Sequence, residues 1–226
     1  MSNLAEEKKF TYQDYIKWGD DIRYELIDGA AYAMAAPSQA HQETSRELLT
    51  QLAVYLKGKS CKVFHAPFDV RLNYDTYDDI VVQPDILVVC DESKLDGQSV
   101  TGAPDFIIEI LSPKNTRYDT EVKFRKYRQA GVKEYWIADP IARNVDVYIL
   151  RGGVYGQGTV YRDGDVIPVH TLPGCRIDLS DIFYDTESDT EITDTEQDIK
   201  YKIISALKNK KISKHQIQKI IDDIEN

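Results

Sequence analysis

Hydrophobic and polar positions divide the chain into segments with helical spacing and segments with the spacing of strands. Leucines recur at helical spacing over residues 39–57, and Gly58 follows as a helix end. Residues 62–72 alternate between polar and apolar side chains, which is typical of a strand with one buried face. Residues 80–90 and 106–111 are almost continuously aliphatic, so we expect two strands that are covered on both faces.

The segments that follow predict how these strands are connected. Residues 118–130 have helical spacing and end at Gly131, residues 134–139 form another apolar strand, and residues 144–161 indicate an antiparallel extension. A helix between the third and fourth strands favours a mixed sheet with helices on both faces. The predicted fold class is therefore α/β.

The N-terminal part of the chain predicts a short helix and a hairpin. Thr11 and Asp14 resemble a helix N-cap followed by an acidic first turn, which predicts a helix over residues 12–18. An Asp-Gly dipeptide at 28–29 lies between two short runs within residues 23–34. This dipeptide favours the positive backbone angles of a tight turn, so we expect a β-hairpin there.

The C-terminal part differs in composition from the rest of the chain. Residues 185–198 carry seven acidic side chains and no basic one, so we expect a linker between a main domain, residues 1–184, and a tail, residues 199–226. Isoleucines at helical spacing predict a helical hairpin in the tail that docks on the main domain, dimerises or binds a protein partner. A small DNA-reading helix-turn-helix is the alternative, because lysines lie nearby at positions 208, 210, 211, 214 and 219.

Composition narrows the class of protein. The chain has 226 residues, 42% of them hydrophobic, and no apolar run approaches the roughly 20 residues that span a bilayer. We expect a cytoplasmic protein that does not enter a membrane. The three cysteines, Cys61, Cys90 and Cys175, are odd in number and far apart, which predicts free thiols.

The distribution of charge qualifies the net charge of −10. That total argues against a general nucleic-acid coat, but residues 114–133 carry seven basic side chains against two acidic ones. Because binding depends on the local field, we expect this basic helix to approach a phosphate backbone.

Two carboxylates interrupt the apolar strands. Asp85 lies in the segment 80–90, and period-two geometry places Glu109 on the opposite face of its strand from Ile108. If Asp85 points to the same side, the two carboxylates converge, repel each other and raise one pKa unless a divalent cation lies between them. Mg²⁺ fits two carboxylates and could support phosphodiester hydrolysis. The structural alternatives are an Asp85 that caps the turn after Pro84 and a Glu109 paired with an arginine.

Lys123 is the third candidate for this site. Asp119, Lys123 and Tyr127 lie at i, i+4 and i+8 on one stripe of the predicted helix, so a lysine on that stripe can face the sheet and reach the carboxylates. Its ammonium group would offset phosphate charge or orient the attacking water. The alternative is that Lys123 belongs to a solvated basic face.

Around these residues the sequence resembles the Uma-type restriction endonuclease family, a branch of the PD-(D/E)XK nuclease superfamily. The resemblance covers about residues 10–183 and leaves the tail outside. It rests on the segments 24–29, 84–85, 103–113 and 131–140 together with His41, Lys123 and Tyr127.

This resemblance implies a restriction endonuclease-like fold that binds Mg²⁺, or Mn²⁺, and hydrolyses DNA phosphodiester bonds. The matching positions make Asp85 and Glu109 the metal ligands, with the carbonyl oxygen of Ile110 as a further ligand. The superfamily places its lysine two residues after the strand glutamate, where this chain has Leu111. Lys123 would then be the migrated replacement for that lysine.

Three further residues and two further expectations complete the prediction. Glu25, His41 and Glu43 are weaker candidates for the rim of the site, and the position of His41 favours a role at the start of its helix. Cutting both strands of a duplex commonly uses two sites related by two-fold symmetry, so we expect a homodimer. The alternative function is a catalytically silent nuclease-fold module that binds nucleic acid or a protein partner.

Overall fold

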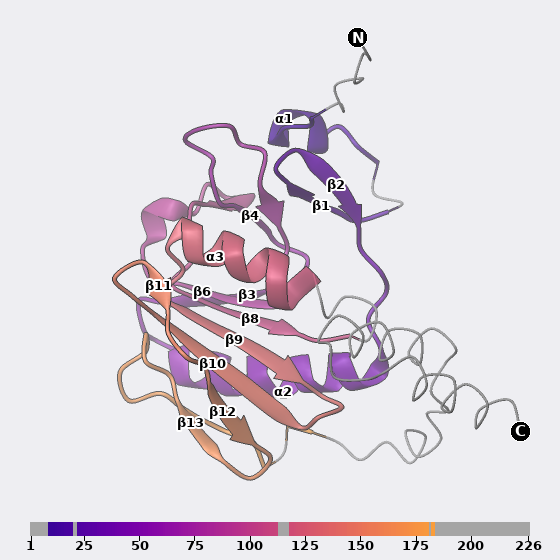
Figure 1. Ribbon diagram of the computed structural model, residues 1–226. Coiled ribbons are helices and arrows are strands. Elements are labelled where there is room, and N and C mark those ends of the chain that lie inside the picture. Colours follow the sequence, from indigo (N-terminus) through magenta and orange to yellow (C-terminus); the bar gives the residue numbers. More distant parts are fainter. Residues whose placement is uncertain (1–8, 20–21, 113–117, 181, 184–226) are drawn as a thin grey trace, which may run out of the picture. The chain divides into compact units, whose positions relative to one another are not determined.

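The computed structural model describes residues 9–19, 22–112, 118–180 and 182–183 (Figure 1). All of these belong to the unit Met1–Tyr184. The expected linker at 185–198 and the expected helical hairpin at 199–226 lie outside the described residues.

The described part of the chain is made of short strands with a few helices and helical turns between them. In chain order these elements are α1 (Tyr12–Tyr15), β1 (Tyr24–Ile27), β2 (Ala30–Ala33), α2 (Gln39–Leu56), β3 (Lys62–His65), β4 (Asp69–Arg71), β5 (Val81–Val82), β6 (Ile86–Val89), the 3₁₀ turn η1 (Glu92–Lys94), β7 (Ser99–Thr101), β8 (Phe106–Ile110), the π-helical turn η2 (Tyr118–Lys123), α3 (Phe124–Ala130), β9 (Glu134–Asp139), β10 (Asn144–Arg151), β11 (Val154–Tyr155), β12 (Thr159–Arg162), β13 (Val166–Pro168) and β14 (Arg176–Asp178).

The central sheet is mixed, as the sequence predicts. Its strand order is β11-β10-β9-β8-β6-β3, with β12 paired to β10. β8 and β9 run parallel, whereas β6 pairs antiparallel with both β3 and β8. A parallel pair needs a crossover connection, and here η2 and α3 supply it. The predicted helix between the third and fourth apolar strands is therefore confirmed.

Helices cover both faces of this sheet. In Figure 1, α2 lies along one face and α3 along the other. Leu48, Leu52 and Leu56 of α2 pack in one apolar cluster with Phe106 and Ile108, whereas Tyr127 of α3 joins the cluster that contains Ile107, Tyr135 and Ile137. Every residue of β8 is buried, which explains why the segment around Glu109 is so apolar.

A second sheet, of order β2-β1-β5-β4-β7, is built around the predicted hairpin. Asp28 and Gly29 have φ angles of 53° and 79°, the positive values that the Asp-Gly turn requires. β1 and β2 pair from Tyr24 with Ala33 to Ile27 with Ala30. At the start of the domain, Asp14 accepts hydrogen bonds from Thr11 at the predicted helix cap.

Two predicted strands are each divided into two. Residues 62–72 form β3 in the central sheet and β4 in the second sheet, and residues 80–90 form β5 in the second sheet and β6 in the central one. A proline lies at each division, Pro67 and Pro84. Proline has no N–H to donate to a sheet ladder, so strand pairing stops there and the chain changes sheets.

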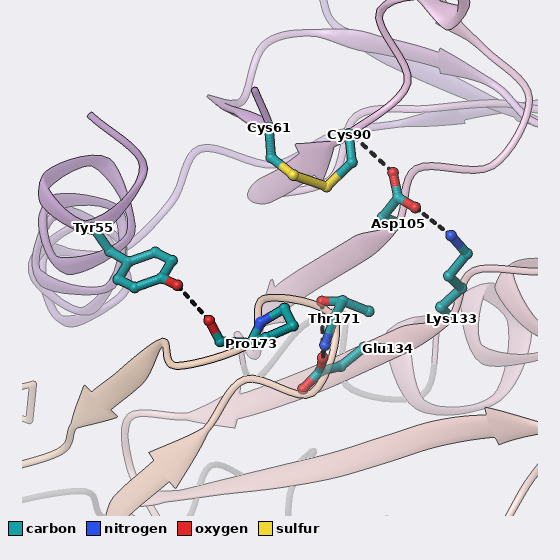
Figure 2. The surroundings of a disulfide bond; sticks show 8 residues. All are labelled: Tyr55, Cys61, Cys90, Asp105, Lys133, Glu134, Thr171 and Pro173. Carbon is teal, nitrogen blue, oxygen red and sulfur yellow. Dashed lines mark hydrogen bonds and ion pairs between the residues drawn. A yellow bond between two sulfur atoms is a disulfide. The ribbon is translucent and has the colours of Figure 1, made fainter. Parts of the chain in front are cut away.

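The expectation of three free thiols is wrong. Cys61 and Cys90 form a disulfide with their Cα atoms 4.0 Å apart (Figure 2). β3 and β6 pair Lys62 with Val89, so the next position outward brings the two cysteines face to face. Beside them, Asp105 accepts a hydrogen bond from the backbone N–H of Cys90. Cys175 is free and buried, as expected of a core cysteine.

No helix among the described residues is long and apolar enough to cross a membrane.

Thiol titration checks the cysteine assignment. Burial raises the pKa of Cys175 to about 11, so the native, unreduced protein should contain no thiol that reacts rapidly with a disulfide reagent. Denaturation without reductant should expose one thiol, and reduction should bring the total to the three cysteines of the chain. Cys175→Ser is the matched control and should expose none before reduction. Three reactive thiols in unreduced, denatured protein would show that the disulfide is absent.

Candidate active site

The two predicted carboxylates lie side by side at one end of the central sheet. β6 pairs antiparallel with β8 and places Ile86 opposite Ile108, so one position further Asp85 lies opposite Glu109. Both side chains line one small pocket of about 100 Å³. The predicted convergence of the two carboxylates is therefore what the structure shows.

Asp85 occupies the point where the chain re-enters the central sheet after Pro84. Its Oδ2 atom accepts a hydrogen bond of 2.8 Å from the backbone N–H of Ile110, on the neighbouring strand. The same oxygen lies 3.2 Å from Nε2 of His41. Asp85 thus contacts the strand that carries Glu109, rather than only capping the turn after Pro84.

Lys123 is fully inside the site. Its side chain is 4% exposed, and its Nζ atom lies 2.9 Å from Glu25, 3.0 Å from Glu109 and 3.5 Å from Asp119. The interpretation of Lys123 as part of a solvated basic face is therefore wrong. The π-helical turn η2 carries both Asp119 and Lys123 inward, and such turns often occur at functional sites.

Glu109 accepts two hydrogen bonds on the same oxygen. Lys123 donates to Oε1 at 3.0 Å, and the hydroxyl group of Tyr127 donates to it at 2.5 Å. Glu109 is 2% exposed. Its partners are thus a lysine from η2 and a tyrosine from α3, in place of the arginine inside the sheet that the alternative interpretation required.

Glu25 lies deeper than the predicted rim position. It comes from β1 of the second sheet, is 2% exposed, and accepts a 2.8 Å hydrogen bond from the backbone N–H of Gln83 as well as pairing with Lys123. We call Glu25, Asp85, Glu109 and Asp119, together with Lys123, the carboxylate cluster.

The other two rim candidates differ in their surroundings. His41, near the start of α2, is buried and reaches Asp85, so it does more than begin its helix. Glu43 accepts a hydrogen bond from Gln39 on its own helix, and it does not line the pocket between Asp85 and Glu109. Sequence reasoning missed Asp119 and Tyr127 as site residues, although their shared stripe with Lys123 was the available signal.

Burial and mutual repulsion shape the ionisation of the cluster. Burial raises the pKa of Glu109 well above its usual range, Lys123 opposes that rise, and Asp119, Asp85 and Glu25 add to it. Burial likewise raises the pKa of Asp119 to about 6. Burial lowers the pKa of Lys123, but Glu109, Glu25 and Asp119 raise it by more, so the lysine stays charged.

The donor atoms suit an oxygen-seeking cation. Within the described part of the chain, no three or more His, Cys, Asp and Glu side chains are already gathered as a metal site. However, the hydrogen bonds that described residues make to the two strand carboxylates fall on Oδ2 of Asp85 and Oε1 of Glu109. Three carboxylates lie within 3.5 Å of the Lys123 ammonium group, and a fourth, Asp85, lines the same pocket, so the four carry three more negative charges than Lys123 balances if all are ionised. A divalent cation fits this charge and these oxygen donors.

The basic helix is less available to DNA than its composition indicates. Lys123 is buried, Lys126 pairs with Asp28 at 2.6 Å, and Lys133 pairs with Asp105 at 2.6 Å. Arg125 on the same stretch is exposed. Two further basic residues of the stretch, Lys114 and Arg117, lie outside the described residues. The expected contact of this helix with a phosphate backbone stays a prediction.

The mixed sheet with helices on both faces is consistent with the restriction endonuclease-like class of nuclease folds. The chain belongs to the Uma2 family, described as "Putative restriction endonuclease", whose family model matches residues 12–180. This confirms the resemblance that the sequence motifs indicated.

Two relatives show how far the similarity extends. The protein slr1290 of Synechocystis sp. PCC 6803, described as uncharacterized, is 27% identical over 151 residues, which cover 65% of this chain and 77% of that protein. A crystal structure of a "putative nuclease belonging to DUF820" from Anabaena variabilis is similar with a TM-score of 0.63 and 20% identity, covering 77% of this chain and 97% of that one. The structural similarity supports the fold.

Replacement of Lys123 tests the arrangement of the cluster. Removing one partner from a buried ion pair leaves charge unpaired, so Lys123→Met should lower the free energy of unfolding by about 3–5 kcal/mol near neutral pH. The pKa values of Glu109 and Asp119 are raised in the folded protein, so as the pH falls these carboxylates become protonated in the folded state before they do in the unfolded state. Protonation removes the negative charge that the loss of Lys123 leaves unpaired. The loss should therefore be smaller at pH 5 than at pH 8, as measured by urea unfolding.

Lys126→Met is the matched control, because its pair with Asp28 lies partly in solvent. We expect that change to cost less than about 1 kcal/mol at either pH. Equal losses for the two lysines, or a loss at Lys123 that does not grow with pH, would contradict the described arrangement.

Proposed function

We propose that this protein is a metal-dependent endonuclease that hydrolyses DNA phosphodiester bonds, with Mg²⁺ as the cofactor and Mn²⁺ as a substitute. The observation that carries the proposal is the carboxylate pair of Asp85 and Glu109 beside the buried ammonium group of Lys123. Membership of a family described as "Putative restriction endonuclease" supports a nucleic acid as the substrate.

In this proposal Asp85 and Glu109 hold the cation through the oxygens that the neighbouring side chains do not use, and the carbonyl oxygen of Ile110 is a further ligand. The bound cation would supply an activated water and stabilise charge on the phosphodiester. The backbone N–H of Ile110 and the ring of His41 fix the orientation of Asp85. Hydrogen bonds from neighbouring groups to a metal ligand commonly orient that ligand and tune how it binds the metal.

Lys123 takes the role of the superfamily's lysine, whose usual position is occupied by Leu111 in this chain. Its ammonium group already lies 3.0 Å from Glu109, so it can orient a water held there or offset charge on a phosphate oxygen. Tyr127 holds the same carboxylate from the helix side. Glu25 and Asp119 keep Lys123 charged and in place, and they are positioning residues in this scheme.

A duplex has two strands and each carboxylate cluster can serve one. We therefore extend the proposal to a homodimer, in which two copies act on opposite strands. The oligomeric state should be measured on the protein used for the cleavage assay. A monomer that only nicks DNA would contradict the homodimer but not the proposed hydrolysis.

Cleavage of plasmid DNA tests the proposal. Supercoiled DNA should be nicked or linearised with Mg²⁺ or Mn²⁺ and left intact with a chelator. Asp85→Asn and Glu109→Gln should each lower the cleavage rate by about 100-fold or more. Each change removes a proposed metal ligand, and even the loss of a residue that only supports a metal ligand commonly lowers activity by about 10–100-fold. Lys123→Met should lower it as well. Calorimetric titration with Mn²⁺ should show binding that both carboxylate variants weaken.

Glu92→Gln serves as the control, because Glu92 is exposed and its ion pair is with a surface lysine, Lys62. It should cleave and bind metal like the unaltered protein. Metal binding that survives loss of both Asp85 and Glu109 would overturn the proposed site. DNA binding without cleavage, unchanged by the three substitutions, would instead support the catalytically silent module.

A further inference from the structure

A second, larger pocket lies next to the carboxylate cluster. It has a volume of about 510 Å³, within the range of roughly 300–1,000 Å³ that is usual for small-molecule sites. Its walls are rich in aromatic side chains from α1 and the turn after it, from β1 and from the segment after Pro67, namely Tyr12, Tyr15, Trp18, Tyr24 and Phe68. Nothing in the proposed phosphodiester chemistry uses this pocket.

Trp18 is the central ring of this wall. It packs edge-on against Tyr15 and Tyr24, with ring centroids 5.7 Å and 5.2 Å away, and also against Phe10 at 5.0 Å. Trp18 nevertheless remains half-buried and lines the pocket. Its neighbours therefore hold the indole in place while part of it stays accessible, which is what a platform for a flat ring requires.

Polar groups occupy one side of the pocket. Nε2 of Gln83 donates to Oδ1 of Asp69 at 2.9 Å and to the hydroxyl oxygen of Tyr15 at 3.0 Å, and that hydroxyl donates to the same Oδ1 at 2.9 Å. These bonds fix which end of the Gln83 amide is the nitrogen. The other end, Oε1, is buried and has no hydrogen-bond partner in the described part of the chain.

That unpaired oxygen is informative because Gln83 is only 7% exposed. A buried polar group without a partner is unfavourable, and native proteins rarely retain one without a reason. Oε1 can only accept a hydrogen bond, and the carboxylate of Asp69 beside it can also only accept. The polar side of the pocket therefore suits a ligand that brings N–H donors.

The pocket and the carboxylate cluster share their walls. In β1, Tyr24 lines the pocket while the next residue, Glu25, contacts Lys123. Gln83 places its side chain at the pocket while its backbone N–H donates to Glu25. Arg23 and Gln83 line both this pocket and the one between Asp85 and Glu109. A single ligand can thus reach both places.

We propose that the aromatic pocket binds one nucleobase, turned out of the strand whose backbone lies at the carboxylate cluster. The base would stack on the Trp18 wall, as bases do on aromatic side chains elsewhere. Its exocyclic amino group would donate to Asp69 and, after a small shift of the Gln83 side chain that exposes it, to Oε1 of Gln83, so bases with such a group are bound in preference to thymine. Arg23, between the two pockets, faces the connecting phosphate. The inference rests on the proposed function for the identity of the ligand.

Trp18 itself provides the measurement. The chain has two tryptophans, and the other, Trp136, is 0% exposed. With chelator present to prevent cleavage, a single-stranded deoxycytidine oligomer of about eight nucleotides, a length typical of one single-strand site, should quench the fluorescence of Trp18. An abasic oligomer of the same length and charge should not, and thymidine should bind more weakly than deoxycytidine.

Substitutions separate stacking from hydrogen bonding. Trp18→Ala should weaken binding of the deoxycytidine oligomer about tenfold or more, the usual effect of losing one base-stacking ring, and Trp18→Phe should abolish the quenching with a smaller loss of affinity. Gln83→Met keeps the backbone N–H that Glu25 needs, so it should remove the preference for cytosine over thymine without altering binding of the abasic oligomer. Tyr77→Ala, at an exposed tyrosine outside the pocket, is the control and should change nothing.

The outcomes distinguish this inference from the proposed function. Base-dependent quenching that is lost in Trp18→Phe, with the preference lost in Gln83→Met, supports the pocket even if no DNA is cleaved. Equal quenching by abasic and deoxycytidine oligomers, or cleavage and base binding that persist fully in Trp18→Ala, would overturn the pocket while the nuclease proposal stands.

Discussion

The ammonium group of Lys123 is the interaction on which the rest of the site depends, because it joins carboxylates from three separate elements. Glu25 comes from the second sheet, Glu109 from the central sheet and Asp119 from the crossover turn. Among the described residues, Lys123 is the one lysine or arginine that is fully buried. Burying a charge is costly without partners, so docking of the two sheets and assembly of the site are one event.

The sequence predicts best where burial leaves a local pattern. β8 is covered on both faces, so its residues are continuously apolar and Glu109 is conspicuous among them. The Asp-Gly turn and the exit at Gly131 follow from the positive φ angles that few residues adopt, and the structure has both. The helical stripe of Lys123 correctly pointed it toward the sheet. In each case the structure is determined by contacts within the element itself or with the layer of residues that packs on it.

Prediction from sequence failed where distant parts of the chain decide the structure. The pattern of alternating or apolar residues indicates which face of a strand is buried, but it does not indicate to which sheet the strand belongs. The changes of sheet at Pro67 and Pro84 were therefore not predicted. The depth of Glu25 depends on how the second sheet docks against Lys123, and no local pattern records that. Cys61 and Cys90 are 29 residues apart in sequence, and only the pairing of β3 with β6 brings them together. Trp18 and Gln83 line one pocket although they too lie far apart in the sequence.

The disulfide has a consequence for the chain before it folds. Cys61 and Cys90 close a loop that holds β3, β4, β5 and β6, including both proline crossings and Asp85. In the chain-entropy description, closing a loop of this length removes about 3–4 kcal/mol of conformational freedom from the unfolded state. In the oxidised protein, therefore, the excursion from one sheet to the other and back is tethered at both ends from the start. The search for the position of Asp85 becomes a local one.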